Sequence, residues 1–129
     1  AIEWGRSQGA RVVPLQVSGA FHSQLMESAV GEIAQIVSRI ELRDPKIPIV
    51  ANTSVHTMTT AQAIKEELPR QVRHCVHWLY SVQYMVRRGV NTFVEIGPDK
   101  VLSGLIKRID SSVQTFSISD MRSIEALSF

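Results

Sequence analysis

The fold of this chain is decided by residues 92–109, which read TFVEIGPDKVLSGLIKRI. Residues 92–96 form a short apolar run with the composition of a strand, Gly97 and Pro98 open a turn, and residues 101–109 carry apolar side chains at helical spacing. A second strand is predicted just beyond, over residues 114–118. A strand, a helix and a strand in this order predict an α/β fold with a mainly parallel sheet.

The rest of the chain continues this alternation of strands and helices. Residues 1–9 have the pattern of the end of a helix, and an apolar run predicts a strand over residues 11–17, closed by Ser18, Gly19 and Ala20. Ser23 is a suitable N-cap for an amphipathic helix that runs to Ile40. The remaining predicted elements are a strand at 47–51, a polar loop at 52–60, a weak helix at 61–68 that Pro69 interrupts, a stronger helix at 73–88, and a short helix at 123–127.

His22 lies at the junction between the first predicted strand and the helix that follows it. Ligands of α/β proteins bind at the carboxyl ends of strands, so we expect loops 18–23, 52–60 and 97–100 to form the rim of a site. Of the residues in these loops, His22 most resembles a group that transfers protons. The structural alternative is a histidine that only caps or packs.

Composition narrows the classes of protein to consider. The 129 residues are 44% hydrophobic and 20% charged, which suits one globular domain with a core. The net charge of +2 comes without a basic run that interleaves aromatic residues, so nucleic acid is not an expected partner. No apolar run is long enough to span a membrane, and residues 1–4 have no features of a signal peptide. The single cysteine, Cys75, cannot form an internal disulfide, and we expect a cytoplasmic protein.

Other candidate sites are weaker than His22. His74 and His77 lie three residues apart, but no carboxylate or cysteine has the spacing that would complete a metal site with them, and His56 lies in a polar loop. Residues 97–100 lack the spacing of a phosphate-binding loop, although the backbone N–H groups of such a turn can line an anion site. No G-x-S-x-G elbow is present, and the carboxylates offer no convincing acid/base pair.

Several blocks of sequence, in order and spacing, resemble the malonyl-CoA:acyl carrier protein transacylase family over about residues 5–109. The blocks are VSGAFHS at 17–23, DPKIPIVAN at 44–52, RQV at 70–72, VHW at 76–78, TFVEIGP at 92–98 and KVLSGL at 100–105. Each block alone is a weak indication, and together they are specific.

The resemblance implies an acyltransferase in which a serine attacks the malonyl thioester and His22 acts as its general base. It implies that the backbone carbonyl of Gln71 orients the His22 ring. Phe21 corresponds to a bulky residue of malonyl-selective members, and Val101 ends a loop beside the substrate entrance. The implied partners are malonyl-CoA, as substrate, and acyl carrier protein, with no cofactor and no metal.

The chain also departs from the family pattern. Asp99 stands where the family has glycine. The elbow serine, the arginine that grips the malonyl carboxylate and a glutamine of the oxyanion region would lie upstream of the segment that matches Ala1. We therefore expect the C-terminal portion of the fold, with residues 1–18 ending a small ferredoxin-like subdomain and residues 19–129 completing a large hydrolase-like one.

These departures set the functional hypotheses. We expect the 129-residue chain to form no malonyl-enzyme alone and to need the missing N-terminal part of the same enzyme. The first hypothesis is a discrete malonyl transacylase of type II fatty-acid synthesis. The alternatives are an acyltransferase domain fragment of a polyketide synthase, and a catalytically silent module that only binds or assembles.

Overall fold

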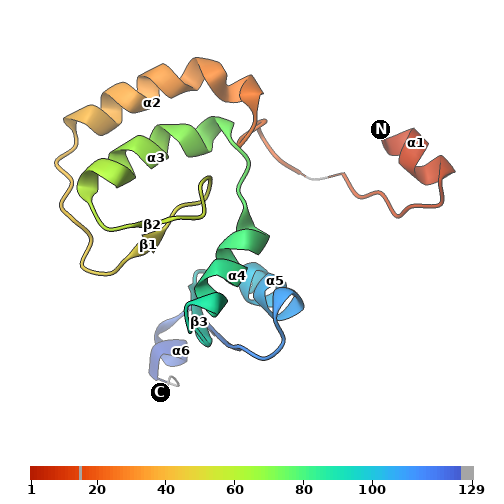
Figure 1. The fold of residues 1–129 in the computed structure, drawn as a ribbon. Coiled ribbons are helices and arrows are strands. Elements are labelled where there is room, and N and C mark those ends of the chain that lie inside the picture. The colour runs from red at the N-terminus through yellow and green to blue at the C-terminus, as the bar shows by residue number, and fades with distance from the viewer. Residues whose placement is uncertain (15, 126–129) are drawn as a thin grey trace.

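A computed structural model of the chain describes residues 1–14 and 16–125. Two packed parts follow an N-terminal helix that lies at the end of an extended segment (Figure 1). The elements in chain order are α1 (Ile2–Ser7), the 3-10 helix η1 (Gln24–Met26), α2 (Glu27–Arg39), β1 (Ile49–Val50), β2 (Thr57–Met58), α3 (Ala61–Arg73), α4 (Trp78–Arg87), β3 (Thr92–Ile96), α5 (Val101–Ile109), β4 (Gln114–Ile118) and α6 (Met121–Glu125).

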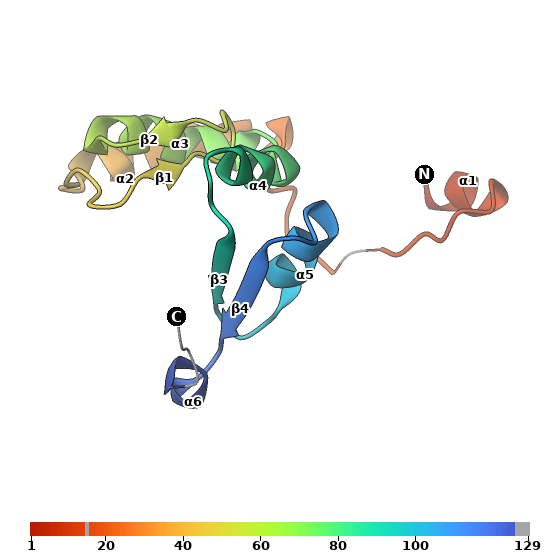
Figure 2. The ribbon, with the colours of Figure 1, turned by 60° about the horizontal axis from the view of Figure 1, so that its bottom comes forward.

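The C-terminal part is the strand–helix–strand unit that the sequence predicts, with the predicted bounds for β3, α5 and β4. The two strands pair in parallel, from Thr92 opposite Gln114 to Ile96 opposite Ile118 (Figure 2). Helices α4 and α5 contribute Val82 and Ile106 to a small core. Val113, just before β4, completes this core, and Phe93 of β3 packs against it. This arrangement confirms an α/β fold.

The other part places α2 and α3 side by side, with a short hairpin below them (Figure 1). The hairpin pairs Ile49 with Met58 in antiparallel fashion, so β2 lies inside the segment predicted as a loop at 52–60. The first turn of α3 is capped twice. The Thr60 hydroxyl accepts the Ala63 N–H at 3.2 Å, and the Asp44 carboxylate accepts the Ala61 N–H at 2.7 Å.

Two predictions about helices in this region are wrong. Helix α3 continues through Pro69 to Arg73, because its packing against α2 outweighs the one backbone hydrogen bond that proline removes. The helix predicted over 73–88 begins only at Trp78. The preceding backbone is extended at His74, and the N–H of His77 donates to the Asn52 carbonyl at 2.9 Å.

The strand predicted over residues 11–17 is also wrong for the described residues of that range. Residues 11–14 and 16–17 have no strand structure, because no other described segment pairs with them, and an unpaired strand lacks its hydrogen bonds. Leu15 of that range lies outside the described residues. The last helix is α6, over 121–125, so it begins earlier than predicted, and residues 126–127 of the predicted range lie outside the described residues.

The solvent-accessible surface of the chain is larger than that of a compact monomer of the same mass. Its accessible area is 9991 Å², whereas a compact monomer of this mass exposes about 6,800 Å². Large apolar side chains contribute, among them Trp4 at 71%, Leu25 at 81% and Ile96 at 80% exposure. No helix among the described residues is long and apolar enough to cross a membrane.

Candidate functional site

His22 has a strained backbone that hydrogen bonds hold in place. Its φ of 61° lies in the left-handed region, which a side chain other than glycine rarely adopts. The backbone N–H of His22 donates to the Val72 carbonyl at 2.9 Å. The side chain of Ser23 is predicted to cap the helix that follows. Its hydroxyl instead donates to the Ala20 carbonyl at 2.7 Å. Strain of this kind is found at functional sites, where the surrounding structure maintains it.

The His22 ring is held by a second carbonyl of the same helix end. Nδ1 lies 2.5 Å from the backbone oxygen of Gln71. A carbonyl oxygen only accepts hydrogen bonds, so Nδ1 carries the proton that is donated to it. In the neutral ring, Nε2 then keeps its lone pair and can accept a proton from another group. The ring is thus oriented and held in one tautomer by a backbone atom rather than by a carboxylate.

The carbonyls of Gln71 and Val72 can accept hydrogen bonds from His22 because α3 ends at Arg73. The last carbonyls of a helix have no partner within the helix, and they must find one elsewhere. The Arg70 carbonyl accepts the N–H of His74 at 3.1 Å, while the carbonyls of Gln71 and Val72 are the two that accept from His22. The end of α3 therefore forms the support on which His22 is held, and its negative dipole end faces the ring.

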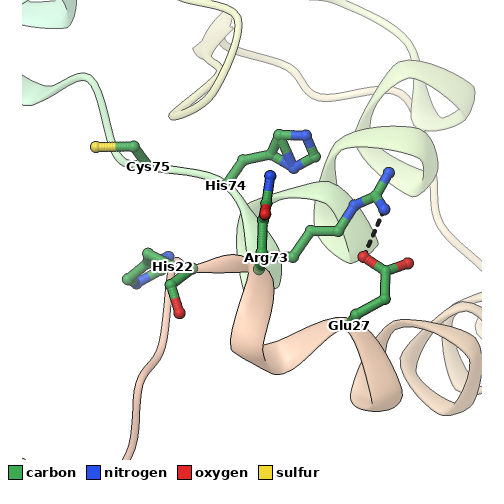
Figure 3. Close-up of a pocket in the computed structure, with 7 residues that line it drawn as sticks. His22, Glu27, Arg73, His74 and Cys75 are labelled. Atoms are coloured by element: carbon green, nitrogen blue, oxygen red, sulfur yellow. Dashed lines mark hydrogen bonds and ion pairs between the residues drawn. The ribbon is translucent and has the colours of Figure 1, made fainter.

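An open hollow of about 740 Å³ lies beside His22 (Figure 3). One wall comes from η1 and the start of α2, and the other from the end of α3 and the segment after it. A salt bridge of 2.6 Å between Arg73 and Glu27 joins the two walls. The lining residues are His22, Ser23, Gln24, Glu27, Arg73, His74 and Cys75.

The structure brings some of the predicted site residues together and leaves others apart. Gln71 meets His22, as described above. Phe21 is 60% exposed, and its ring lies over Gly19, where an added Cβ would stand only 3.0 Å from the ring. Val101 is 62% exposed at the start of α5 and does not line the hollow at His22. Lys100, in the loop before it, lines a separate hollow.

Hence the predicted rim of three loops is only partly formed. The loop at 52–60 approaches His22 through the end of α3, since the Asn52 side chain donates to the Gln71 side-chain oxygen at 2.8 Å. Sequence reasoning did not single out Asn52. The only indication in the sequence is that Asn52 directly follows a strand, and many polar residues do so.

The other histidines make local contacts. His56 Nδ1 lies 2.6 Å from the Ser54 carbonyl, and His74 Nδ1 lies 3.1 Å from the Arg70 carbonyl. His77 lies at the start of α4 with its ring near that of Tyr80. Residues 1–14 and 16–125 contain no group of three or more histidine, cysteine or acidic side chains that could hold a metal ion.

The turn at 97–100 does not leave the start of α5 open to an anion. The carboxylate of Glu95 accepts the N–H of Leu102 at 3.0 Å and that of Ser103 at 2.7 Å. Two of the N–H groups expected to be free are thus bonded to a side chain of β3. The sequence does not reveal this contact, because a strand residue reaches a helix start only through the turn geometry between them.

These contacts predict a dependence of stability on pH. The hydrogen bond from the Ser103 side chain, supported by the backbone N–H groups of Ser103 and Leu102, lowers the pKa of Glu95 against a weaker opposing effect of burial. A lowered folded-state pKa adds stability above the unfolded pKa, and this stability is lost as the pH falls through the folded pKa. We expect Glu95→Gln to unfold more readily than the wild type at neutral pH, with the difference shrinking below about pH 4.

Urea unfolding followed by circular dichroism at a series of pH values measures this difference. Glu41→Gln changes an exposed glutamate in the loop before β1 and provides the background. A difference between Glu95→Gln and wild type that stays constant from neutral to acidic pH would contradict the assignment.

Comparisons with known proteins extend the interpretation. No family model matches the chain. The malonyl CoA-acyl carrier protein transacylase of Bacillus subtilis (strain 168) is 39% identical over 126 residues, covering 97% of the chain and 40% of the relative. The crystal structure of an acyl-carrier-protein S-malonyltransferase from Burkholderia pseudomallei superposes with a TM-score of 0.88 at 38% identity, covering 96% of this chain and 41% of that one.

A third comparison is a malonyl-transacylase solved in complex with a type II PKS acyl-carrier protein. It has a TM-score of 0.86 at 36% identity and covers 93% of this chain and 39% of that chain.

The parallel strand–helix–strand unit and these neighbours define the chain as part of an α/β acyltransferase fold. Among acyltransferases, the relatives and solved structures that it matches are malonyl CoA-acyl carrier protein transacylases, which confirms the resemblance seen in the sequence. The chain spans about 40% of the length of these relatives.

Proposed function

We propose that the protein transfers a malonyl group from malonyl-CoA to the phosphopantetheine thiol of an acyl carrier protein. The observation that carries this proposal is the His22 ring, whose Nδ1 lies against the Gln71 carbonyl so that Nε2 can accept a proton. The relatives named malonyl CoA-acyl carrier protein transacylase support the choice of substrate and acceptor. Because the chain spans part of their length, the reaction is proposed for the full-length gene product.

In this proposal His22 is the general base of a two-step transfer. Nε2 takes the hydroxyl proton of a serine that this chain does not supply, the serine oxygen bonds to the malonyl carbonyl carbon, and the carbon–sulfur bond to coenzyme A breaks. The imidazolium returns its proton to the departing thiolate. In the second step the carrier thiol gives its proton to Nε2, its sulfur attacks the seryl ester, and the serine oxygen regains the proton.

The helix end suits this exchange of protons. When the ring is protonated, Nδ1 continues to donate to the Gln71 carbonyl, so no hydrogen bond is lost. The negative end of the α3 dipole stabilises the positive charge that the ring carries between the two proton transfers. Because the His22 backbone is bonded to Val72 as well, the ring does not have to move during the reaction.

Two classes of carrier protein are candidates for the acceptor of the malonyl group. A carrier protein of type II fatty-acid synthesis is the first, as expected from the sequence. The second is a carrier protein of polyketide synthesis, which the complex of a neighbouring malonyl-transacylase with a type II PKS acyl-carrier protein favours. A cytoplasmic location, the subdomain boundary at residue 18 and a substrate-entrance role for Val101 stay predictions from the sequence.

The test uses radiolabelled malonyl-CoA with the full-length gene product. We expect covalent label on the protein, and its passage to either type of carrier protein once the phosphopantetheine is attached. A protein that takes up no label would support the alternative of a silent binding or assembly module. Labelling of the isolated 129-residue chain would contradict the expectation that its own residues lack the nucleophile.

Phe21 gives a prediction about the choice of acyl group. If its bulk beside His22 crowds an α-methyl substituent, Phe21→Ser should admit methylmalonyl-CoA. We expect the ratio of kcat/KM for malonyl-CoA to that for methylmalonyl-CoA to fall by about tenfold, the usual effect of one methyl group in a pocket. Phe21→Leu keeps much of the bulk and should retain most of the selectivity. Equal ratios in all three proteins would remove Phe21 from substrate selection.

A further inference from the structure

The helix end that holds His22 is itself tied to the loop after β1. Glu67 and Gln71 lie four residues apart in α3 and therefore on one face of the helix. The Thr53 N–H and hydroxyl donate to the two carboxylate oxygens of Glu67, each at 2.8 Å. The Asn52 amide donates to the Gln71 side-chain oxygen, also at 2.8 Å. Two successive loop residues are thus hydrogen-bonded to two successive turns of the helix.

Two further features stabilise these hydrogen bonds between the loop and α3. Glu67 is only 6% exposed, so its carboxylate depends on the hydrogen bonds from Thr53 rather than on water. On the other side, the Asn52 carbonyl accepts the N–H of His77 at the start of α4. Asn52 therefore connects α3 and α4 across residues 74–77, next to the α3 carbonyls that accept hydrogen bonds from His22.

Gln71 is the residue through which this anchoring reaches the site. Its side chain accepts from Asn52, and its backbone carbonyl accepts from the His22 ring. A rotation of the last turn of α3 would move that carbonyl and turn the imidazole with it. The side-chain bond opposes such a rotation.

We propose that Asn52 is a positioning residue, which fixes the last turn of α3 so that the Gln71 carbonyl holds His22 in its reactive orientation. This inference rests on the proposed function of His22. Asn52 itself bonds to Gln71 and not to the His22 ring, so it acts on the rate of proton transfer and not on the binding of malonyl-CoA.

The test is the rate of malonyl-enzyme formation in the full-length gene product. Asn52→Leu removes the amide at similar size, and we expect about a tenfold lower rate constant, because small displacements of a catalytic group are costly. The KM for malonyl-CoA should not change. Gln71→Leu keeps the backbone carbonyl, breaks the same bond from the other side and should give the same loss. Asn52→Asp should retain most of the rate, because the Gln71 amide can turn and donate to the new carboxylate.

Gln62→Leu is the matched control, since Gln62 donates to Glu66 at 2.9 Å and both side chains are exposed, in the first half of the same helix. It should leave the rate unchanged. A rate loss in Gln62→Leu equal to that in Asn52→Leu would indicate a general effect on α3 and overturn the proposal. So would an unchanged rate in Asn52→Leu, or a raised KM with an unchanged rate constant.

A His22→Ala background separates this inference from the proposed function. If Asn52 acts through His22, adding Asn52→Leu to His22→Ala should lower the residual rate no further. A further tenfold loss in the double variant would show that Asn52 acts by another route. If His22→Ala alone leaves the rate intact, the proposed function of His22 fails instead, and the positioning role fails with it.

Discussion

Replacing His22 with alanine in the full-length gene product is expected to slow formation of the malonyl-enzyme by at least ~10²-fold, the usual scale for the loss of a general base. The reason lies in the geometry of the ring. The Gln71 carbonyl oxygen lies 2.5 Å from Nδ1 and accepts a hydrogen bond from it, which leaves Nε2 to take the proton of the attacking hydroxyl. Without the imidazole, that proton must pass to water, and the hydroxyl attacks only in its weakly nucleophilic form.

Rapid quenching of a single turnover with radiolabelled malonyl-CoA measures this rate apart from product release. His56→Ala is the matched control, because His56 also bonds to a backbone carbonyl through Nδ1 but does so within its own loop, at Ser54. We expect its rate to equal that of the wild type. A His22→Ala rate within a few-fold of wild type would exclude general-base catalysis by His22, since such catalysis contributes at least ~10²-fold.

The part of the fold that the sequence predicted best is the part with the most local determinants. The strands at 92–96 and 114–118 and the helix at 101–109 have the predicted bounds, because each is a short apolar run bordered by turn residues. The predicted end of α3 and the predicted start of α4 are wrong for the opposite reason. Pro69 is a local sign of a helix end, and the packing of α3 on α2 overrides it.

The central residue of the site could be predicted from its place in the sequence, whereas the residues that hold it in position could not. His22 stands out by its place between two elements, but the carbonyl that holds it comes from a residue 49 positions along the chain. Every residue has a backbone carbonyl, so residue type does not identify Gln71 as the acceptor. Only the family resemblance implied this role. The sequence alone predicts Glu67 to lie on a solvated helix face and gives Asn52 no role, because their contacts depend on which turn of α3 faces the hairpin, and packing decides this.

The same reasoning applies to Glu95. Its carboxylate accepts hydrogen bonds from the N–H groups of Leu102 and Ser103 in the first turn of α5, while the sequence suggests only a glutamate within a strand. Only residues 97–100 separate β3 from α5. Residues that act across a tight turn are thus close in sequence and still not recognisable from their spacing.

Truncation of Ile106 to alanine is expected to weaken the strand–helix–strand unit by about 2–5 kcal/mol. Ile106 is 4% exposed and meets Val82 and Val113, which are 0% and 2% exposed, so its removal leaves a cavity lined by apolar atoms. This core is small, since it contains only these three buried residues among those the structure describes. A loss of this size is therefore a large share of what holds β3 and β4 against α4 and α5.

Hydrogen–deuterium exchange, read by mass spectrometry in peptides from residues 92–118, measures the effect where it arises, whatever the stability of the rest of the protein. Slowly exchanging amides of β3 and β4 should exchange about 30-fold faster or more in Ile106→Ala, as the ratio of open to closed states rises. Leu105→Ala is the matched control, because Leu105 is the neighbour of Ile106 in α5 but is 37% exposed. Its effect should be several times smaller in free energy. If both variants accelerate exchange equally, the loss comes from helix α5 as a whole, and the buried cluster does not hold the two strands in place.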